Sequence, residues 1–308
     1  MQGFKRILVA LGADRTSSGA LERARALAME NQAHITLALV EADVPALSRM
    51  FLPARIAEWE KIVMKENAAR LEERAASLRS DNIEVSTRVL KGSEPIELIR
   101  LVLRENQDLV LKDFPANNEG GLAGGDLRLL RKCPCPVWMV KSDGKETIKR
   151  ILAAVDPQPG DVERNALNIR LVELAVALAQ AHAAELHVVH AWSVAGASTL
   201  DRWLSPEEAD RYVDTVRDGV GKVFDELIRD VPGAAALART HMVHGTPETA
   251  IPHMVQEEGI DLVVMGTVAR TGVPGLLIGN TAEKVLPRIS CSILAVKPEH
   301  FVSPVTVD

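Results

Sequence analysis

The chain repeats itself once in the same order, and this repeat limits the folds that it can adopt. Three segments of the first half return in the second: residues 5–10 (KRILVA) as 149–154 (KRILAA), 108–111 (DLVL) as 261–264 (DLVV), and 135–141 (CPVWMVK) as 291–297 (CSILAVK). A polar stretch, SDGKE at 142–146, joins the two copies. The sequence therefore predicts two domains of one fold, residues 1–144 and 145–308.

Each copy alternates short apolar runs with longer amphipathic segments. Strands are expected at 7–11, 35–40, 83–90, 108–111 and 137–140, and again at 151–155, 185–191, 239–243, 261–265 and 293–296. Helices are expected at 18–31, 55–79, 95–104 and 127–132, and again at 163–181, 206–229, 247–258 and 281–286. Strands that alternate with helices pair in parallel through right-handed crossovers. We therefore expect an α/β chain of two tandem doubly wound, Rossmann-like domains, which bind ligands beyond the carboxyl ends of their strands.

Composition agrees with this fold class and argues against several partners. Aromatic residues make up only 3% of the 308 residues, so the cores must be built from aliphatic side chains. A net charge of -6 argues against a nucleic-acid partner. No apolar run reaches the roughly 20 residues that span a bilayer, so no membrane partner is expected. Three cysteines do not make a disulfide framework, and the expected location is the cytoplasm.

A glycine-rich segment, VMGTVARTGVPGLLIGNTAEKVL, joins a buried strand of the second copy to a helix. Free N–H groups and the positive end of the helix dipole meet where such a helix begins, and both favour a phosphate. Gly266 and Gly279 have no Cβ, so an anion can approach the backbone closely. Asn280 and Thr281 offer side-chain donors, and Arg270 can neutralise a phosphate. The segment is therefore a candidate phosphate site.

These residues resemble the universal stress protein family. Its signature after the fourth strand is Gly, two residues, Gly, nine residues, Gly, and then Ser or Thr. Here Gly266, Ala269, Gly279 and Asn280 fall on those places with the family spacing. GNTAEKVL is similar to the segment that follows the loop in family members, and LRKCP with PVWMVK looks like the end of the first half in tandem, E-type members. The resemblance covers nearly the whole chain.

The resemblance implies a five-stranded parallel sheet of order 3-2-1-4-5 in each domain, with flanking helices. It also implies that some members bind ATP at the strand tips, whereas others lack the loop and do not. Matched by position, Asp156 is the aspartate on the adenosine side and Ala191 is the backbone contact to adenine. The ribose and phosphate loop corresponds to Gly266, Ala269, Gly279, Asn280 and Thr281. The cofactor expected in the second domain is ATP or AMP, with no metal.

Two residues weaken this phosphate site. Ala269 stands in place of the second glycine, and a left-handed backbone at that position would cost an alanine roughly 1–2 kcal/mol. A loss of about 1.4 kcal/mol is tenfold in affinity. Pro274 removes one N–H group and stiffens the loop. The sequence therefore leaves nucleotide binding by the second copy open.

The first copy lacks the signature. Its loop, KDFPANNEGGLAGGD, is shorter than that of the second copy. The glycine pairs Gly120-Gly121 and Gly124-Gly125 are typical of flexible turns. Alignment of the copies puts Gly12 opposite Asp156, with Asp14 two residues further on. We expect this copy to be structural, or to bind something other than a nucleotide in its cleft.

The fifth strands of the two copies are expected to join them. An exposed edge of a parallel sheet attracts a partner strand, and members of the resembled family pair through these strands. Here the pairing would occur within one chain, between 137–140 and 293–296. A homodimer of chains would then resemble the tetramer of single-domain members.

Histidines and cysteines give no strong metal motif. His187 and His190 lie three residues apart on an expected strand, as do His241 and His244, and such pairs point to opposite faces. Cys133-Pro134-Cys135 has no second cysteine pair to complete a zinc site. The favoured interpretation is that the histidines are buried or lie at the rim, and that Cys133-Pro134-Cys135 leads into a strand, since Cys291 repeats at the position of Cys135.

The sequence also lacks catalytic motifs. No nucleophile elbow, Walker A or HEXXH motif occurs. We therefore expect a regulatory or binding protein of the stress response rather than an enzyme. Two alternatives stay open. One is a slow ATPase that acts as a switch. The other is an interaction protein whose cleft is empty or holds a lipid or another small apolar ligand.

Overall fold

The computed structural model describes residues 3–12, 19–45, 50–115, 122, 124–142, 147–194, 203–267 and 279–307. The first copy contains β1 (Arg6–Ala10), α1 (Gly19–Asn31), β2 (His34–Glu41), α3 (Pro53–Ser80), β3 (Val85–Lys91), α4 (Glu94–Glu105), β4 (Leu109–Pro115), α5 (Gly124–Lys132) and β5 (Val137–Ser142). The second contains β6 (Arg150–Val155), α6 (Val162–His182), β7 (Glu185–Trp192), α8 (Pro206–Asp230), α9 (Ala234–Leu237), β8 (Ala238–His244), α10 (Pro247–Glu257), β9 (Leu262–Gly266), α11 (Asn280–Val285), the 3₁₀ turn η1 (Leu286–Arg288) and β10 (Ser292–Val296). Strands and helices alternate in both copies, as predicted.

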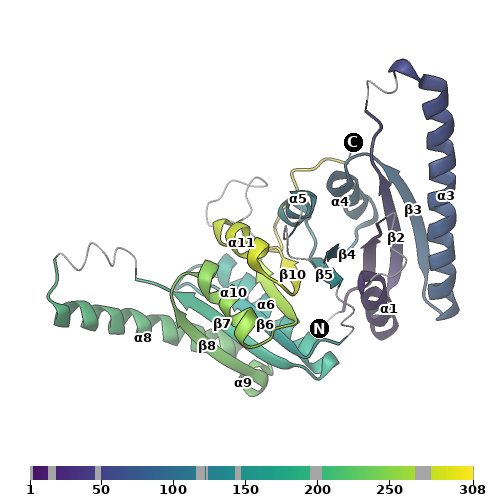
Figure 1. Ribbon diagram of the computed structural model, residues 1–308. Helices are drawn as coiled ribbons and strands as arrows, with labels where there is room; N and C mark the ends of the chain where they lie inside the picture. Colours follow the sequence, from purple (N-terminus) through teal and green to yellow (C-terminus); the bar gives the residue numbers. More distant parts are fainter. Residues whose placement is uncertain are drawn as a thin grey trace.

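The ten strands form one continuous sheet of order β3-β2-β1-β4-β5-β10-β9-β6-β7-β8 (Figure 1). Each copy contributes five parallel strands in the order 3-2-1-4-5, which confirms the implied topology. Helices α1, α3, α6 and α8 pack on one face of the sheet and α4, α5, α10 and α11 on the other. The central strands are buried on both faces, which explains why their sequences are continuous apolar runs.

The two copies meet at β5 and β10, the only antiparallel neighbours in the described sheet. Trp138 lies opposite Leu294, and these residues occupy equivalent positions in the repeat. The predicted pairing of the fifth strands within one chain is therefore confirmed. Because this pairing is antiparallel, the carboxyl ends of the strands point in opposite directions in the two halves.

A repeated aspartate explains part of the sequence repeat. The carboxylate of Asp108, just before β4, accepts hydrogen bonds from the backbone N–H groups of Lys5 and Arg6 at 2.8 and 3.0 Å. The carboxylate of Asp261, just before β9, accepts the same pair of bonds from the N–H groups at the start of β6, at 2.9 and 3.1 Å. Each aspartate thus fixes the register of the fourth strand against the first.

Some boundaries differ from the predicted ones. Gly124 and Gly125, interpreted above as turn residues, belong to the first turn of α5. A Cβ at either position would meet no atom within 4 Å, so neither glycine is required by space. Gly120 and Gly121 lie outside the described residues. The short helix α9 was not predicted, and α3 begins at Pro53, two residues before the expected start at residue 55.

Among the described helices, none is long and apolar enough to cross a membrane.

Candidate functional site

The predicted site lies at the carboxyl edge of the second copy. Strand β6 pairs with β7 on one side and β9 on the other, so the ends of these three strands are neighbours. Asp156 directly follows β6, Ala191 is the penultimate residue of β7, and Gly266 ends β9. Gly279 is the N-cap of α11. Tertiary structure therefore brings these predicted residues to one edge of the sheet.

Asp156 is held in place by its neighbours. Its backbone N–H donates to Oδ1 of the buried Asn168 at 3.0 Å, and its Oδ1 accepts a hydrogen bond from Nε2 of Gln158 at 3.0 Å. Nη1 of Arg164 lies 3.7 Å from its Oδ2, and the Asp156 side chain is 40% exposed. A carboxylate that is fixed and still accessible can accept a hydrogen bond from a sugar hydroxyl.

Helix α6 begins beside this carboxylate. The Asp161 side chain caps the helix by accepting a hydrogen bond from the backbone N–H of Arg164 at 3.1 Å. The Arg164 Nε lies 3.4 Å from the Asp161 carboxylate. Arg164 therefore spans two carboxylates at the edge of the candidate site and fixes the turn between β6 and α6.

Gly266 has a packing role that the sequence did not predict. A Cβ at this position would lie 3.0 Å from Cδ2 of Leu167 on α6. That distance is tighter than ordinary van der Waals contact, although the end of a leucine side chain can shift. The glycine therefore allows α6 to pack closely on the end of β9, whether or not an anion also approaches it.

The two ends of the glycine-rich loop are tied together at Thr267. The carbonyl of Thr267 accepts a hydrogen bond from the N–H of Gly279 at 3.1 Å, and its own N–H donates to the carbonyl of Val296 at 3.2 Å. Its side chain is fully buried and accepts a hydrogen bond from Nζ of Lys297 at 2.7 Å. The start of α11 is thus fixed relative to β9 and β10.

Lys297 is unusual because its side chain is buried, whereas lysines are mostly exposed. It is 3% exposed, and its Nζ lies 4.8 Å from the centroid of the Phe301 ring. Burial lowers the pKa of Lys297 to about 7. The Thr267 hydroxyl, its partner, lies 3.5 Å from the carbonyl of Leu130 in α5. This buried cluster therefore connects the base of the loop to the first copy.

Several predicted site residues fall outside the described part of the chain. Ala269, Arg270 and Pro274 all lie in the segment 268–278. Of Asn280, only the backbone at the start of α11 is described, whereas the side chain of Thr281 is partly exposed. The roles predicted for these residues stay predictions.

A sequence profile described as "Universal stress protein family" matches residues 3–141 and 147–297. The chain belongs to the universal stress protein family. The two matched segments correspond to the two halves of the sheet, so this is a tandem member of the family. The exact boundary between residues 144 and 145 stays a prediction.

Relatives with the same tandem length support this assignment. Universal stress protein E of Escherichia coli K12 is 29% identical over 316 residues, which cover 100% of this chain and 98% of that protein. A universal stress protein E homolog of Haemophilus influenzae is 30% identical over 306 residues, covering 96% and 98% of the two chains. A protein of Pseudomonas aeruginosa PAO1, described as functionally unknown, has a solved structure that superposes with a TM-score of 0.76 at 28% identity, covering 97% of this chain and 95% of that one.

The first copy of this universal stress protein differs at the matching strand end. Ala10 pairs with Lys112 in the first copy, and Ala154 pairs with Met265 in the second. The residues that follow, Asp113 and Gly266, therefore occupy equivalent positions in the repeat. The Oδ1 of Asp113 accepts a hydrogen bond from the N–H of Ala20 at 3.0 Å, at the start of α1. A carboxylate of the protein itself thus occupies a helix N-terminus at this edge.

A second carboxylate lies at the start of α5 in the first copy. Lys112 bridges Asp126 in that helix, at 2.9 Å, and Glu94 at the start of α4, at 2.6 Å. Burial alone would lower the pKa of Lys112, but these two carboxylates raise it above its ordinary value. The first copy therefore closes its strand edge with an ion-pair network of its own.

The histidines of the second copy divide between the two faces of the sheet. Nδ1 of His187 and Nε2 of His241 lie 3.0 Å apart with their rings stacked. His190 Nδ1 donates instead to the carbonyl of Val155 at 3.1 Å, and His244 packs on Trp192. Within the described ranges, no three histidine, cysteine or acidic side chains are grouped as a metal site would need.

Sequence reasoning missed three residues that organise the site: Asn168, Thr267 and Lys297. The sequence carries a partial signal for two of them, since Thr267 follows the first signature glycine and Lys297 repeats Lys141. Burial of the lysine could not be read from the repeat, because its counterpart Lys141 is partly exposed. Asn168 carries no signal, since its contact with Asp156 depends on the turn between β6 and α6.

Proposed function

We propose that this universal stress protein is a regulatory binding protein of the stress response whose second copy binds an adenine nucleotide. The observation that carries the proposal is the meeting of Asp156, Ala191, Gly266 and Gly279 at one strand edge, with Gly279 at the start of α11. Asp156 would bind the ribose, and the backbone of Ala191 would contact the adenine. Gly266, Ala269, Arg270, Gly279, Asn280 and Thr281 would bind the phosphates.

The structure of the first copy supports a division of roles. In the first copy, Asp113 stands at the position that corresponds to Gly266, and Asp126 lies at the start of α5. Like charges at a phosphate site oppose binding. We propose that the first copy binds no nucleotide and supports the second through the shared sheet.

An adenine nucleotide is the ligand class to test first. One universal stress protein has been solved in complex with cAMP. That observation belongs to that protein and does not assign a ligand to this one. The roles proposed for these residues are all binding roles, so we propose binding without dedicated catalysis.

Calorimetric titration of the full chain with ATP, AMP and cAMP tests the proposal. We expect saturable binding of at least one of them, with about one site per chain. Asp156→Asn should weaken it about tenfold, which corresponds to about 1.4 kcal/mol. Asp113→Asn makes the same chemical change at the edge of the first copy and should leave the affinity unchanged.

Two results would contradict the proposal. The first is neither heat nor a thermal shift with any of the three nucleotides. The second is an equal loss of affinity in both variants, which would place the ligand elsewhere. Release of inorganic phosphate from bound ATP, followed over hours, would instead support the slow ATPase.

A further inference from the structure

A cavity of about 480 Å³ opens at the carboxyl edge of the first copy. It lies at the end of that copy's sheet formed by β3 and β2, away from β5. It lies between the ends of β2 and β3 and the N-terminal half of α3. The lining residues include Glu41, Trp59, Glu60, Met64 and Lys91. Small-molecule sites in proteins usually measure about 300–1,000 Å³. The cavity is therefore large enough for a small organic ligand.

The length of α3 explains why this cavity exists. The helix has 28 residues, or about 42 Å at 1.5 Å per residue. The edge strand β3 has seven residues and spans about 23 Å. The fully buried residues of α3 begin only at Asn67, so its first half extends past the sheet. The inner side of that half, near Ala57 and Met64, therefore faces a hollow instead of the core.

One carboxylate in the cavity is fixed without a charged partner. The buried Asn67 donates from Nδ2 to Oε2 of Glu41 at 3.1 Å. Among the described residues, no lysine or arginine forms an ion pair with Glu41. Glu60, in contrast, is paired with Nζ of Lys91 at 2.6 Å. A half-buried carboxylate without a counter-ion attracts a cation.

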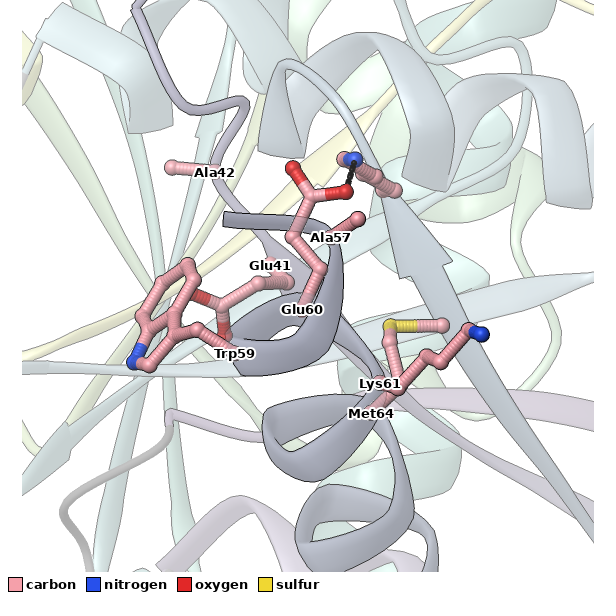
Figure 2. A pocket seen from close by; sticks show the side chains of 8 residues that line it. Glu41, Ala42, Ala57, Trp59, Glu60, Lys61 and Met64 are labelled. Carbon is pink, nitrogen blue, oxygen red and sulfur yellow. Dashed lines mark ion pairs between the residues drawn. The ribbon is translucent and has the colours of Figure 1, made fainter. Parts of the chain in front are cut away.

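The indole of Trp59 also lines the cavity. Figure 2 shows Trp59 and Glu41 together on one side, while the ammonium group of Lys61 lies on the other. Trp59 is 47% exposed, and the cation–ring contacts of the described residues do not involve it. The face of an indole attracts cations more strongly than the rings of other aromatic side chains do. Met64 adds a flexible apolar surface that adapts to different ligands.

We propose that this cavity binds a small organic cation, with its ammonium group between Trp59 and Glu41 and its apolar part against Ala57 and Met64. The site is separate from the nucleotide site proposed for the second copy and does not depend on it. A carboxylate and an aromatic face together select a cation against an anion of the same size. Glu60 and Lys91 also line the cavity, and their ion pair has no net charge.

Three ligands of equal chain length test the charge requirement: hexyltrimethylammonium, hexyl sulfate and 1-hexanol. Each is titrated into the full chain, and binding is followed by calorimetry. We expect saturable binding of the ammonium compound, at least tenfold tighter than binding of the alcohol. Hexyl sulfate should not bind.

Variants then locate the site. Glu41→Gln keeps an acceptor for Asn67 but removes the charge, and it should weaken ammonium binding about tenfold. Trp59→Leu should weaken it to a similar extent. Glu58→Gln makes the same charge change on the exposed side of α3, and Trp203→Leu changes an exposed tryptophan of the second copy. Both controls should bind as the wild type does. Thermal unfolding of each variant identifies any that has lost its fold, and Trp59→Phe then replaces Trp59→Leu.

Three outcomes would overturn the proposal. Equal affinity for hexanol and the ammonium compound would make the cavity a purely apolar site. Tighter binding of hexyl sulfate would assign it to an anion. Absence of saturable binding up to about 10 mM ligand, or binding that the Glu41 and Trp59 variants do not weaken, would leave the cavity without this function.

Discussion

Lys297 ties the base of the glycine-rich loop to the strand that joins the two copies. Its Nζ donates to Thr267, whose carbonyl in turn accepts the N–H of Gly279. Burial lowers the pKa of Lys297 to about 7, whereas a lysine in an unfolded chain titrates near 10.4. The unfolded chain therefore binds one more proton than the folded one between these values. Stability should rise with pH in this window and be lowest below pH 7.

The variant Lys297→Met should lack this dependence of the free energy of unfolding on pH. Between pH 7.0 and 8.5, the free energy of unfolding of the wild type should rise by about 1.6 kcal/mol relative to that of the variant. The cysteines are the same in both chains, so the contribution of their thiols cancels from this comparison. Urea unfolding at several pH values measures the difference. Lys149→Met, at an exposed lysine, should follow the wild type; a parallel course for Lys297→Met would contradict the prediction.

Asp113 acts as a capping carboxylate for α1. Removal of such a cap usually costs about 0.5–2 kcal/mol. Asp113→Ala should therefore lower the free energy of unfolding by about 1 kcal/mol, because the N–H of Ala20 loses its acceptor. Asp113→Asn keeps an acceptor and should cost less. Urea unfolding tests both variants, and an equal effect of Glu299→Ala, at an exposed position, would mean that the cap contributes nothing.

At the level of elements, the long helices α3 and α8 share one feature. Their buried residues lie only in the later parts: from Asn67 onward in α3, and at Phe224, Leu227 and Ile228 in α8. Figure 1 shows α8 extending away from the sheet. Isolated helical segments are marginally stable in water. The first half of α8 must therefore depend on its own local contacts.

The capping box at Ser205 is the strongest of these local contacts. The Ser205 side chain accepts a hydrogen bond from the N–H of Glu208 at 3.3 Å, and Glu208 accepts one from the N–H of Ser205 at 2.9 Å. Ser205→Ala should reduce amide protection over residues 208–216 about fivefold in hydrogen exchange, since a cap contributes about 1 kcal/mol. The midpoint of global thermal unfolding should change by less than about 2 °C, because this segment is not part of the core. A large change in that midpoint would contradict the prediction.

Sequence patterns predicted the central strands well because these strands are buried on both faces. Their continuous apolar runs, such as ILVA in β1 and LVVM in β9, leave little doubt about period or length. The starts of helices were harder to predict where the local residues also suit a turn. The sequence Gly124-Gly125 is typical of a turn, but both residues lie in the first turn of α5. The next residue, Asp126, is held there by its ion pair with Lys112. The four-residue α9 is too short to show any period.

The candidate site was predictable only in part, for a similar reason. The spacing of Gly266 and Gly279 is written in the chain, and so is the position of Asp156 after a strand. The bond between Asn168 and Asp156 depends on the turn between β6 and α6, and the bond between Lys297 and Thr267 joins two neighbouring strands, so no sequence spacing encodes either of them. The cavity beside Trp59 was also not predicted, because it depends on the difference in length between α3 and β3.

For the molecule as a whole, the seam between β5 and β10 holds the two cores together. Trp138 is fully buried there, and the guanidinium of Arg23 lies 5.4 Å from its ring centroid. Truncation of a buried tryptophan to alanine usually costs about 3–5 kcal/mol. Trp138→Ala should destabilise the chain by this amount and weaken the coupling between its halves.

Calorimetry tests this coupling directly. The wild type should unfold in one transition, and Trp138→Ala in two, since each half retains most of its own core. Leu37→Ala, at a fully buried position in β2 away from the seam, should lower the temperature of unfolding without dividing the transition. A single transition for Trp138→Ala would mean that the rest of the seam suffices to couple the halves.

The antiparallel seam has a genetic consequence. When two identical chains meet across a two-fold axis, every substitution appears twice, so both binding edges must change together. Here a single gene encodes both halves of the two-fold arrangement, so a substitution in one half leaves the other half unchanged. Asp113 can therefore stand at one strand end while Gly266 stands at the other. Duplication within a single chain therefore allows the two equivalent strand edges to diverge, one toward an internal ion-pair network and the other toward an accessible glycine.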